Sequence, residues 1–122
     1  MKPKLLLVDD SGLARRSLRA MLESGGFEVV EAEDGMTAIE RYFLERPDVV
    51  MLDLVMKGMY GLEVLTKLRE IDPTARVIVV SADIQRSSHQ LVEEAGAIAF
   101  LSKPVDREQL LNVVQSVLGT VR

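Results

Sequence analysis

The chain has 122 residues, a formal net charge of -4 and no cysteine. This length fits one domain and leaves no room for a second core, so we expect a single domain over residues 1–122 that closes without disulfides. The acidic balance argues against a nucleic-acid-binding surface, which needs clustered lysines and arginines. No apolar run approaches the roughly 20 residues that cross a bilayer, and the N-terminus has no signal-peptide core, so we expect a cytoplasmic protein without membrane contact.

Five short runs rich in Val, Ile and Leu alternate along the chain with stretches of helical periodicity. The runs predict strands at residues 4–8, 27–30, 49–52, 77–80 and 97–101. The spacing of apolar residues predicts helices around residues 14–22, 36–43, 62–68, 86–95 and 110–118, of which the fourth is the weakest. Glycines or prolines fall where each of the first four helices must end before the next strand. The order of elements is (βα)5.

This alternation predicts an α/β fold, namely a doubly wound, flavodoxin-like parallel sheet with helices on both faces, whose five strands we expect in the order 2-1-3-4-5. Ligands of such sheets bind at the carboxyl ends of the strands, where the winding direction reverses. Polar residues follow the apolar runs directly at these ends. They are Asp9 and Asp10 after the first strand, Asp53 after the third, Ser81 after the fourth and Lys103 after the fifth. We therefore expect these residues to form a site.

The first and third strands are neighbours in this order, so Asp9, Asp10 and Asp53 should converge on one small volume. Three close carboxylates repel one another, and either protonation of one or a bound cation must relieve that repulsion. Ligands that are all oxygens suit a hard ion, which predicts Mg²⁺ rather than a softer metal. A carboxylate beside Mg²⁺ can attack phosphorus as a nucleophile, and Lys103 and Ser81 could supply a cation and a hydroxyl to the transferring group.

The segments LLLVDD, VVMLDLVM, VIVVSAD and AFLSKP resemble the response-regulator receiver family of two-component signalling, of the single-domain chemotaxis type. The resemblance covers the whole chain, and the joint spacing of the motifs is highly specific, whereas a lone DD or KP carries little weight. It implies that Asp9 and Asp10 are the acidic pair, that Asp53 is the phosphoacceptor, and that Ser81 and Lys103 are the switch hydroxyl and the site lysine.

The same resemblance implies how the domain would work. Val55 would offer its backbone carbonyl to Mg²⁺, and Phe100 would be the switch aromatic that fills the space opened when the phosphoryl group on Asp53 draws Ser81 inward. The Lys103–Pro104 bond would be cis, against a prior of about one in twenty for an X-Pro bond. A sensor histidine kinase would donate the phosphoryl group, and a downstream effector protein would respond, because no effector segment is present. The domain would be a switch and not an enzyme.

The loop after Asp53 departs from the family pattern. Lys57 stands where the family usually has Pro, and Gly58 follows it, which should loosen the loop because Pro restricts and Gly widens backbone freedom. The side chain of Val55 can donate nothing to an attacking water. The lifetime of the phosphorylated form therefore stays open, and Asp83, beyond the fourth strand, is a second position that bears on it.

The same residues disfavour several other functions. An enzyme of the haloacid-dehalogenase type also uses a strand-end Asp with Mg²⁺, but it places a general acid two positions later, where this chain has Val55. A P-loop nucleotidase would need GxxxxGK[ST], and a flavin binder would need an aromatic-rich loop. The remaining alternative is a degenerate receiver that binds partners without being phosphorylated; such a domain is expected to lack a site residue, and here all are present.

Overall fold

The computed structural model describes residues 2–56, 58, 60–82 and 86–119 and confirms the predicted α/β fold. Five parallel strands form one sheet in the order β2-β1-β3-β4-β5, and five helices alternate with them along the chain. The elements are β1 (Lys4–Val8), α1 (Gly12–Ser24), β2 (Glu28–Ala32), α2 (Gly35–Glu45), β3 (Val49–Leu52), α3 (Gly61–Ile71), β4 (Val77–Ser81), α4 (Arg86–Glu94), β5 (Ala99–Ser102) and α5 (Arg107–Leu118).

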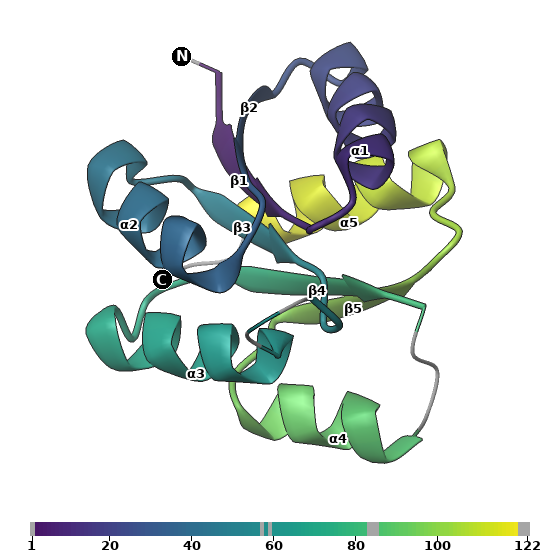
Figure 1. Ribbon diagram of the computed structural model, residues 1–122. Coiled ribbons are helices and arrows are strands. Elements are labelled where there is room, and N and C mark those ends of the chain that lie inside the picture. The colour runs from purple at the N-terminus through teal and green to yellow at the C-terminus, as the bar shows by residue number, and fades with distance from the viewer. Residues whose placement is uncertain (1, 57, 59, 83–85, 120–122) are drawn as a thin grey trace.

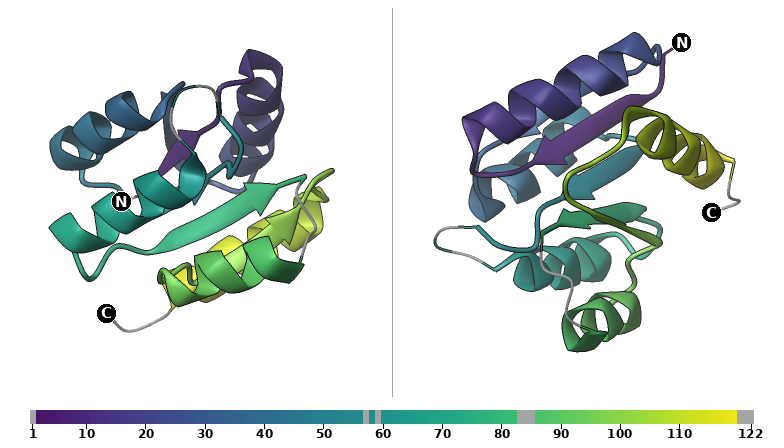
Figure 2. Two further views of the ribbon diagram at one scale, coloured as in Figure 1. Left: turned by 60° about the horizontal axis from the view of Figure 1, so that its bottom comes forward. Right: turned by 90° about the vertical axis from the view of Figure 1, so that its right-hand side faces the viewer.

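The helices lie in two layers, with α1 and α5 on one face of the sheet and α2, α3 and α4 on the other (Figures 1 and 2). Every residue of β3 and β4 is buried, which explains why these strands are unbroken apolar runs. Each face has its own apolar core. Under α2, α3 and α4 it includes Leu6, Val8, Val50, Leu52, Val64, Leu65, Leu68 and Val79. Under α1 and α5 it includes Leu5, Leu7, Leu18, Leu22, Met51, Ile78, Leu110 and Val114.

Two strands begin later than the sequence predicted, β2 by one residue and β5 by two. In both cases the preceding helix uses the predicted first residue to close its own end. The Phe27 N–H donates to the Leu22 carbonyl at 3.2 Å, and the Ala97 N–H donates to the Val92 carbonyl at 3.0 Å. Such a bond pairs one of the last free carbonyls of a helix. Phe27 and Ala97 are therefore apolar because they pack at helix ends rather than in a strand.

Among the described residues, three helices are directly preceded by a residue whose side chain accepts a hydrogen bond from the N–H three residues later. These residues are Ser11, Asp34 and Asp106. Such caps satisfy N–H groups that the helix leaves without an intrahelical partner. Ser11 comes directly after Asp9 and Asp10, so its cap sets where the loop that carries them ends. Within the part of the chain that the structure describes, no helix is long and apolar enough to cross a membrane.

Candidate phosphorylation and metal site

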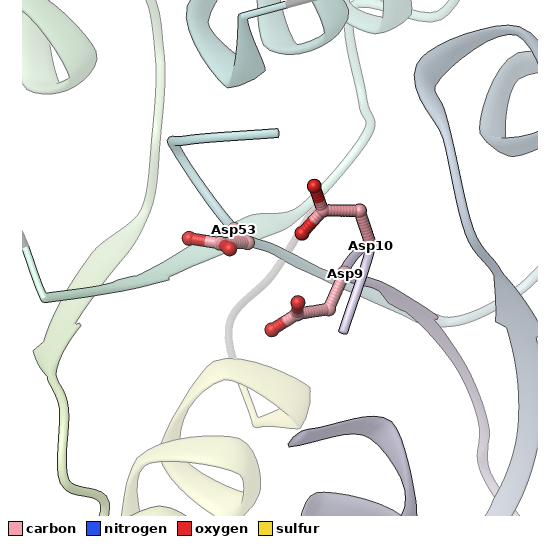
Figure 3. Close-up of side chains that lie close together, drawn as sticks. All are labelled: Asp9, Asp10 and Asp53. Atoms are coloured by element: carbon pink, nitrogen blue, oxygen red, sulfur yellow. The ribbon is translucent and has the colours of Figure 1, made fainter. Parts of the chain in front are cut away.

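The three predicted carboxylates meet at the carboxyl ends of β1 and β3. These strands are paired in register, with Val8 opposite Leu52, so the residues that follow them leave the sheet side by side. Asp9, Asp10 and Asp53 each offer a carboxylate oxygen, and these oxygens all lie within 4.8 Å of one another (Figure 3). Asp9 and Asp53 are buried and Asp10 is exposed. The structure thus brings together the acidic cluster that the strand order predicted.

Lys103 reaches this cluster from the end of β5. Its Nζ donates to Asp9 Oδ2 at 2.7 Å and lies 3.6 Å from Asp53 Oδ2. The backbone N–H of Lys103 donates to the Ser81 carbonyl at 2.9 Å, which ties the end of β5 to the end of β4. The Lys103–Pro104 peptide bond is cis, as predicted. The Lys103 ammonium therefore faces two of the three carboxylates.

Backbone groups hold the two buried carboxylates from the other side. Asp9 Oδ1 accepts from the Ser11 N–H at 2.9 Å, and Asp53 Oδ1 accepts from the Val55 N–H at 3.3 Å. The main chain of both residues continues the sheet, because the Asp53 N–H donates to the Val8 carbonyl at 2.9 Å. The aim of each carboxylate is therefore set by the strand end and by the loop that follows it.

Burial raises the pKa of the Asp53 carboxyl above its usual range. The Lys103 ammonium opposes this shift, and the Asp9 carboxylate adds to it. For Lys103, burial alone would lower the pKa, but the hydrogen bond to Asp9 and the charge of Asp53 outweigh it, and the pKa is raised. Lys103 is thus held as an ammonium, whereas the Asp53 carboxylate is in a position that disfavours its charge. A cation bound among the carboxylate oxygens would offset the unfavourable negative charge on Asp53, so the residues fit a site for a hard divalent metal.

The other predicted residues are placed around this centre. Ser81 is the last residue of β4 and is buried, and Val55 is exposed in the loop after Asp53. Phe100 is partly buried in β5, where its ring lies 4.3 Å from the ring of His89 on α4, centroid to centroid, at an interplanar angle of 48°. His89 is exposed on α4, yet its ring packs against the predicted switch aromatic.

The predictions about Lys57 and Asp83 concern positions outside the described residues. Gly58, which directly follows Lys57 in the loop after Asp53, is described and adopts a positive φ of 86°.

Gly61 matches the family pattern in the loop after Asp53, but the sequence assigned it no role in the site. It begins α3, whose preceding residue makes no side-chain cap, and its N–H donates instead to the Leu54 carbonyl at 2.7 Å. A Cβ at this position would lie 2.4 Å from the Asp53 carbonyl oxygen and 2.6 Å from the Leu54 Cα. Only glycine lets the start of α3 come this close to the backbone of Asp53. The available signal was a glycine at a helix start without a capping side chain.

With this geometry in place, comparison with known proteins identifies the class. The chain belongs to the response regulator receiver domain family, whose family model matches residues 5–115. It is 37% identical over 120 residues to the chemotaxis protein CheY of Bacillus subtilis, an alignment that covers 98% of this chain and 100% of that protein. It is 33% identical over 118 residues to the sporulation initiation phosphotransferase F of the same organism, covering 97% of this chain and 95% of that protein.

Solved structures agree with this assignment. The crystal structure of the CheX-CheY-BeF3-Mg+2 complex from Borrelia burgdorferi superposes with a TM-score of 0.92 and 34% sequence identity, covering 97% of this chain and 90% of that chain. A CheY-like response regulator receiver domain protein from Methanospirillum hungatei superposes with a TM-score of 0.92 and 26% identity, covering 97% and 94%. This chain is therefore a CheY-like receiver domain of the two-component response regulators.

Proposed function

We propose that Asp53 accepts a phosphoryl group from a sensor histidine kinase in a Mg²⁺-dependent reaction, and that the resulting aspartyl phosphate switches the domain so that it controls a downstream effector protein. The observation that carries this proposal is the convergence of three carboxylates within 4.8 Å, with the Lys103 ammonium 2.7 Å from Asp9 and 3.6 Å from Asp53. The domain, over residues 1–122, acts as a cytoplasmic switch that assists its own phosphorylation.

The transfer itself asks little of the protein beyond position and charge. A carboxylate oxygen of Asp53 forms a bond to phosphorus, while the bond from phosphorus to the imidazole nitrogen of the donor histidine breaks and that nitrogen keeps the electron pair. Lys103 lies close enough to Asp53 to pair with an oxygen of the incoming group, and a charge-assisted bond of this kind is stronger than a neutral one. Ser81 would donate its hydroxyl to another phosphoryl oxygen.

Asp10 and Asp53 would hold the metal together with the backbone carbonyl of Val55, and Asp9 would act largely through water. The set consists of oxygens alone, which suits Mg²⁺. When bound, Mg²⁺ would neutralise negative charge on the transferring group. Support comes from the raised pKa of Asp53, since burial and the Asp9 charge both disfavour an uncompensated carboxylate there. A relative from Borrelia burgdorferi was crystallised with Mg²⁺ and BeF3.

Ser81 and Phe100 would transmit the conformational change from the phosphorylation site to the protein surface. Phosphoryl oxygens on Asp53 would draw the Ser81 hydroxyl inward, and Phe100 would fill the space that this movement opens. The surface of α4, β5 and α5 would then report phosphorylation to the effector. Two observations support this role: Ser81 ends β4 directly beside β5, and the Phe100 ring lies against α4 through His89. Only a difference in contacts between the two states can shift their populations, and Ser81 and Lys103 would supply that difference.

The first test is direct phosphorylation. The protein is incubated with acetyl phosphate and Mg²⁺, and its intact mass is measured at short times. We expect one phosphate on the wild type and none on Asp53→Asn. An exposed carboxylate variant, Glu40→Gln, serves as a matched control and should label like the wild type. Equal labelling of Asp53→Asn would rule out Asp53 as the acceptor. A wild type that takes no phosphate would favour the degenerate receiver that acts only as a binding module.

The second test concerns the metal. Mg²⁺ should raise the melting temperature of the wild type by mass action, because it binds the folded state. The double variant Asp10→Ala, Asp53→Ala should lose this rise. If the double variant responds to Mg²⁺ as the wild type does, the metal binds elsewhere.

A further inference from the structure

Arg15, on the second turn of α1, contacts the backbone of the acidic pair. Its Nη1 donates to the Asp9 carbonyl at 2.6 Å, and its Nε donates to Glu31 Oε1 at 2.9 Å. Glu31 lies on β2, the strand next to β1, and it also receives Arg19 from the next turn of α1. The Arg15 and Glu31 side chains are only 18% and 28% exposed. One guanidinium thus ties the end of β1 to β2 through two hydrogen bonds in different directions.

This contact restrains a peptide group in the candidate metal site. The carbonyl of Asp9 and the N–H of Asp10 belong to one planar unit, so whatever holds the carbonyl also fixes the direction in which Asp10 leaves the sheet. The other side of Asp9 is held as well, since its N–H donates to the Ala32 carbonyl at 3.2 Å. Asp10 itself is exposed beyond the strand end. Its aim toward Asp53 therefore depends on the peptide that Arg15 holds.

We propose that Arg15 is a positioning residue for the Mg²⁺ site, with Glu31 fixing Arg15 in turn. This inference rests on the proposed function, because it concerns the same metal. Arg15 acts through the Asp9–Asp10 peptide and contacts neither the metal nor the phosphoryl group. Partners that orient a metal ligand from behind typically change metal affinity by about 10- to 100-fold when they are removed.

The sign of the effect separates positioning from charge. Arg15 carries a positive charge near a cation site, so removing that charge would, by electrostatics alone, tighten Mg²⁺ binding. Removing a positioning contact weakens it. A residue that merely stabilised the fold would lower the melting temperature and leave the affinity of the folded protein unchanged. The three roles thus predict three different results for one substitution.

The test is the Kd for Mg²⁺, measured by calorimetric titration of the full chain, with circular dichroism to confirm folding. Arg15→Gln should raise the Kd about tenfold. Arg19→Gln is the matched control, because it also removes a Glu31 ion pair but has no contact with Asp9. Arg16→Gln, on an exposed residue of the same helix, controls for charge. Both controls should bind Mg²⁺ as the wild type does or slightly more tightly.

Arg15→Lys should restore only part of the affinity, because one ammonium cannot replace a planar fork that bonds in two directions. A wild-type or lower Kd for Arg15→Gln overturns the inference. If Arg15→Gln does not fold, Arg15→Lys decides instead, because it keeps the charge: a raised Kd supports the inference and a wild-type Kd overturns it. If the wild type binds no Mg²⁺, both the proposed function and this inference are overturned. If the wild type binds Mg²⁺ and the Arg15→Gln variant binds it equally well, only this inference is overturned.

Discussion

Replacing Asp53 by Asn should stabilise the metal-free protein, although Asp53 is the proposed phosphoacceptor. The substitution keeps the size of the side chain and leaves an oxygen that can accept from the Val55 N–H, but it removes a buried negative charge. That charge is disfavoured in the folded state, because burial raises the pKa of Asp53 and the Asp9 carboxylate raises it further. Removing the charge should therefore increase the free energy of unfolding.

The distances give the size of the effect. With an effective dielectric constant of about 20, the attraction between unit charges at 3.6 Å, the separation of Lys103 and Asp53, is about 4.6 kcal/mol. The repulsion from Asp9 and from Asp10, at separations up to 4.8 Å, is at least about 3.5 kcal/mol each. The three charges together leave a net repulsion of roughly 2 kcal/mol. Solvent screens part of the share of the exposed Asp10, while burial, the largest cause of the raised pKa of Asp53, adds to the cost of its charge. We expect a gain of about 1 to 2 kcal/mol.

The assay is urea unfolding of the wild type and Asp53→Asn in EDTA, with Glu40→Gln as an exposed control that should change by less than about 0.5 kcal/mol. Because the folded-state pKa of Asp53 is raised above its unfolded value, the native state takes up the proton first, so wild-type stability should rise as the pH falls from neutral toward that pKa. The difference in the free energy of unfolding between Asp53→Asn and the wild type should therefore become smaller as the pH falls. Mg²⁺ should also make this difference smaller, because it should stabilise only the wild type. An Asp53→Asn protein less stable than the wild type in EDTA would refute this electrostatic account.

Three further predictions concern other parts of the site. Gly61→Ala should lower the free energy of unfolding by about 1 to 3 kcal/mol in the same assay, because a Cβ would lie 2.4 Å from the Asp53 carbonyl oxygen; a neutral effect would contradict that close approach. Lys103→Met should destabilise the metal-free protein by about 2 kcal/mol or more, since it leaves the buried Asp9 carboxylate without its cation, and a stability equal to wild type would show that the ion pair contributes nothing. Beryllofluoride should change the amide NMR shifts around Phe100 and α4 in the wild type, and Ser81→Ala should suppress these changes. Undiminished changes in Ser81→Ala would show that the Ser81 hydroxyl does not couple the phosphorylation site to Phe100 and α4.

The sheet and the acidic cluster could be predicted because buried parallel strands leave little freedom. Strands such as β3 and β4 are buried on both faces, so their apolar runs are unbroken and the first polar residue after each run marks the strand end. Once the strand order is known, Asp9 and Asp53 must be neighbours, because Val8 and Leu52 are paired in the sheet. The position of Lys103 follows from the same rule at the end of β5.

What the sequence did not reveal depends on contacts between elements far apart in the chain. Apolar periodicity describes which face of a helix is buried, but it does not say that Arg15 of α1 reaches both a strand-end carbonyl and Glu31 of β2. The contact between His89 and Phe100 is of the same kind, since it joins an exposed helical position to a strand. Phe27 and Ala97 show why strand starts were predicted too early: an apolar residue before a strand can equally belong to the end of the preceding helix.

The two-layer arrangement also determines when this fold can be completed during synthesis. The face covered by α2, α3 and α4 acquires its helices in the middle of the chain, but the face covered by α1 and α5 needs Leu110, Val114 and Val117, which are translated late. A nascent chain that has emerged only as far as β5 would leave apolar side chains of β3 and β4, such as Met51 and Ile78, without the helix that covers them. Partly synthesised chains of this type expose surface that favours aggregation. We therefore expect this face of the sheet to be fully covered only after α5 has left the ribosome, and contact with chaperones to be concentrated before that point.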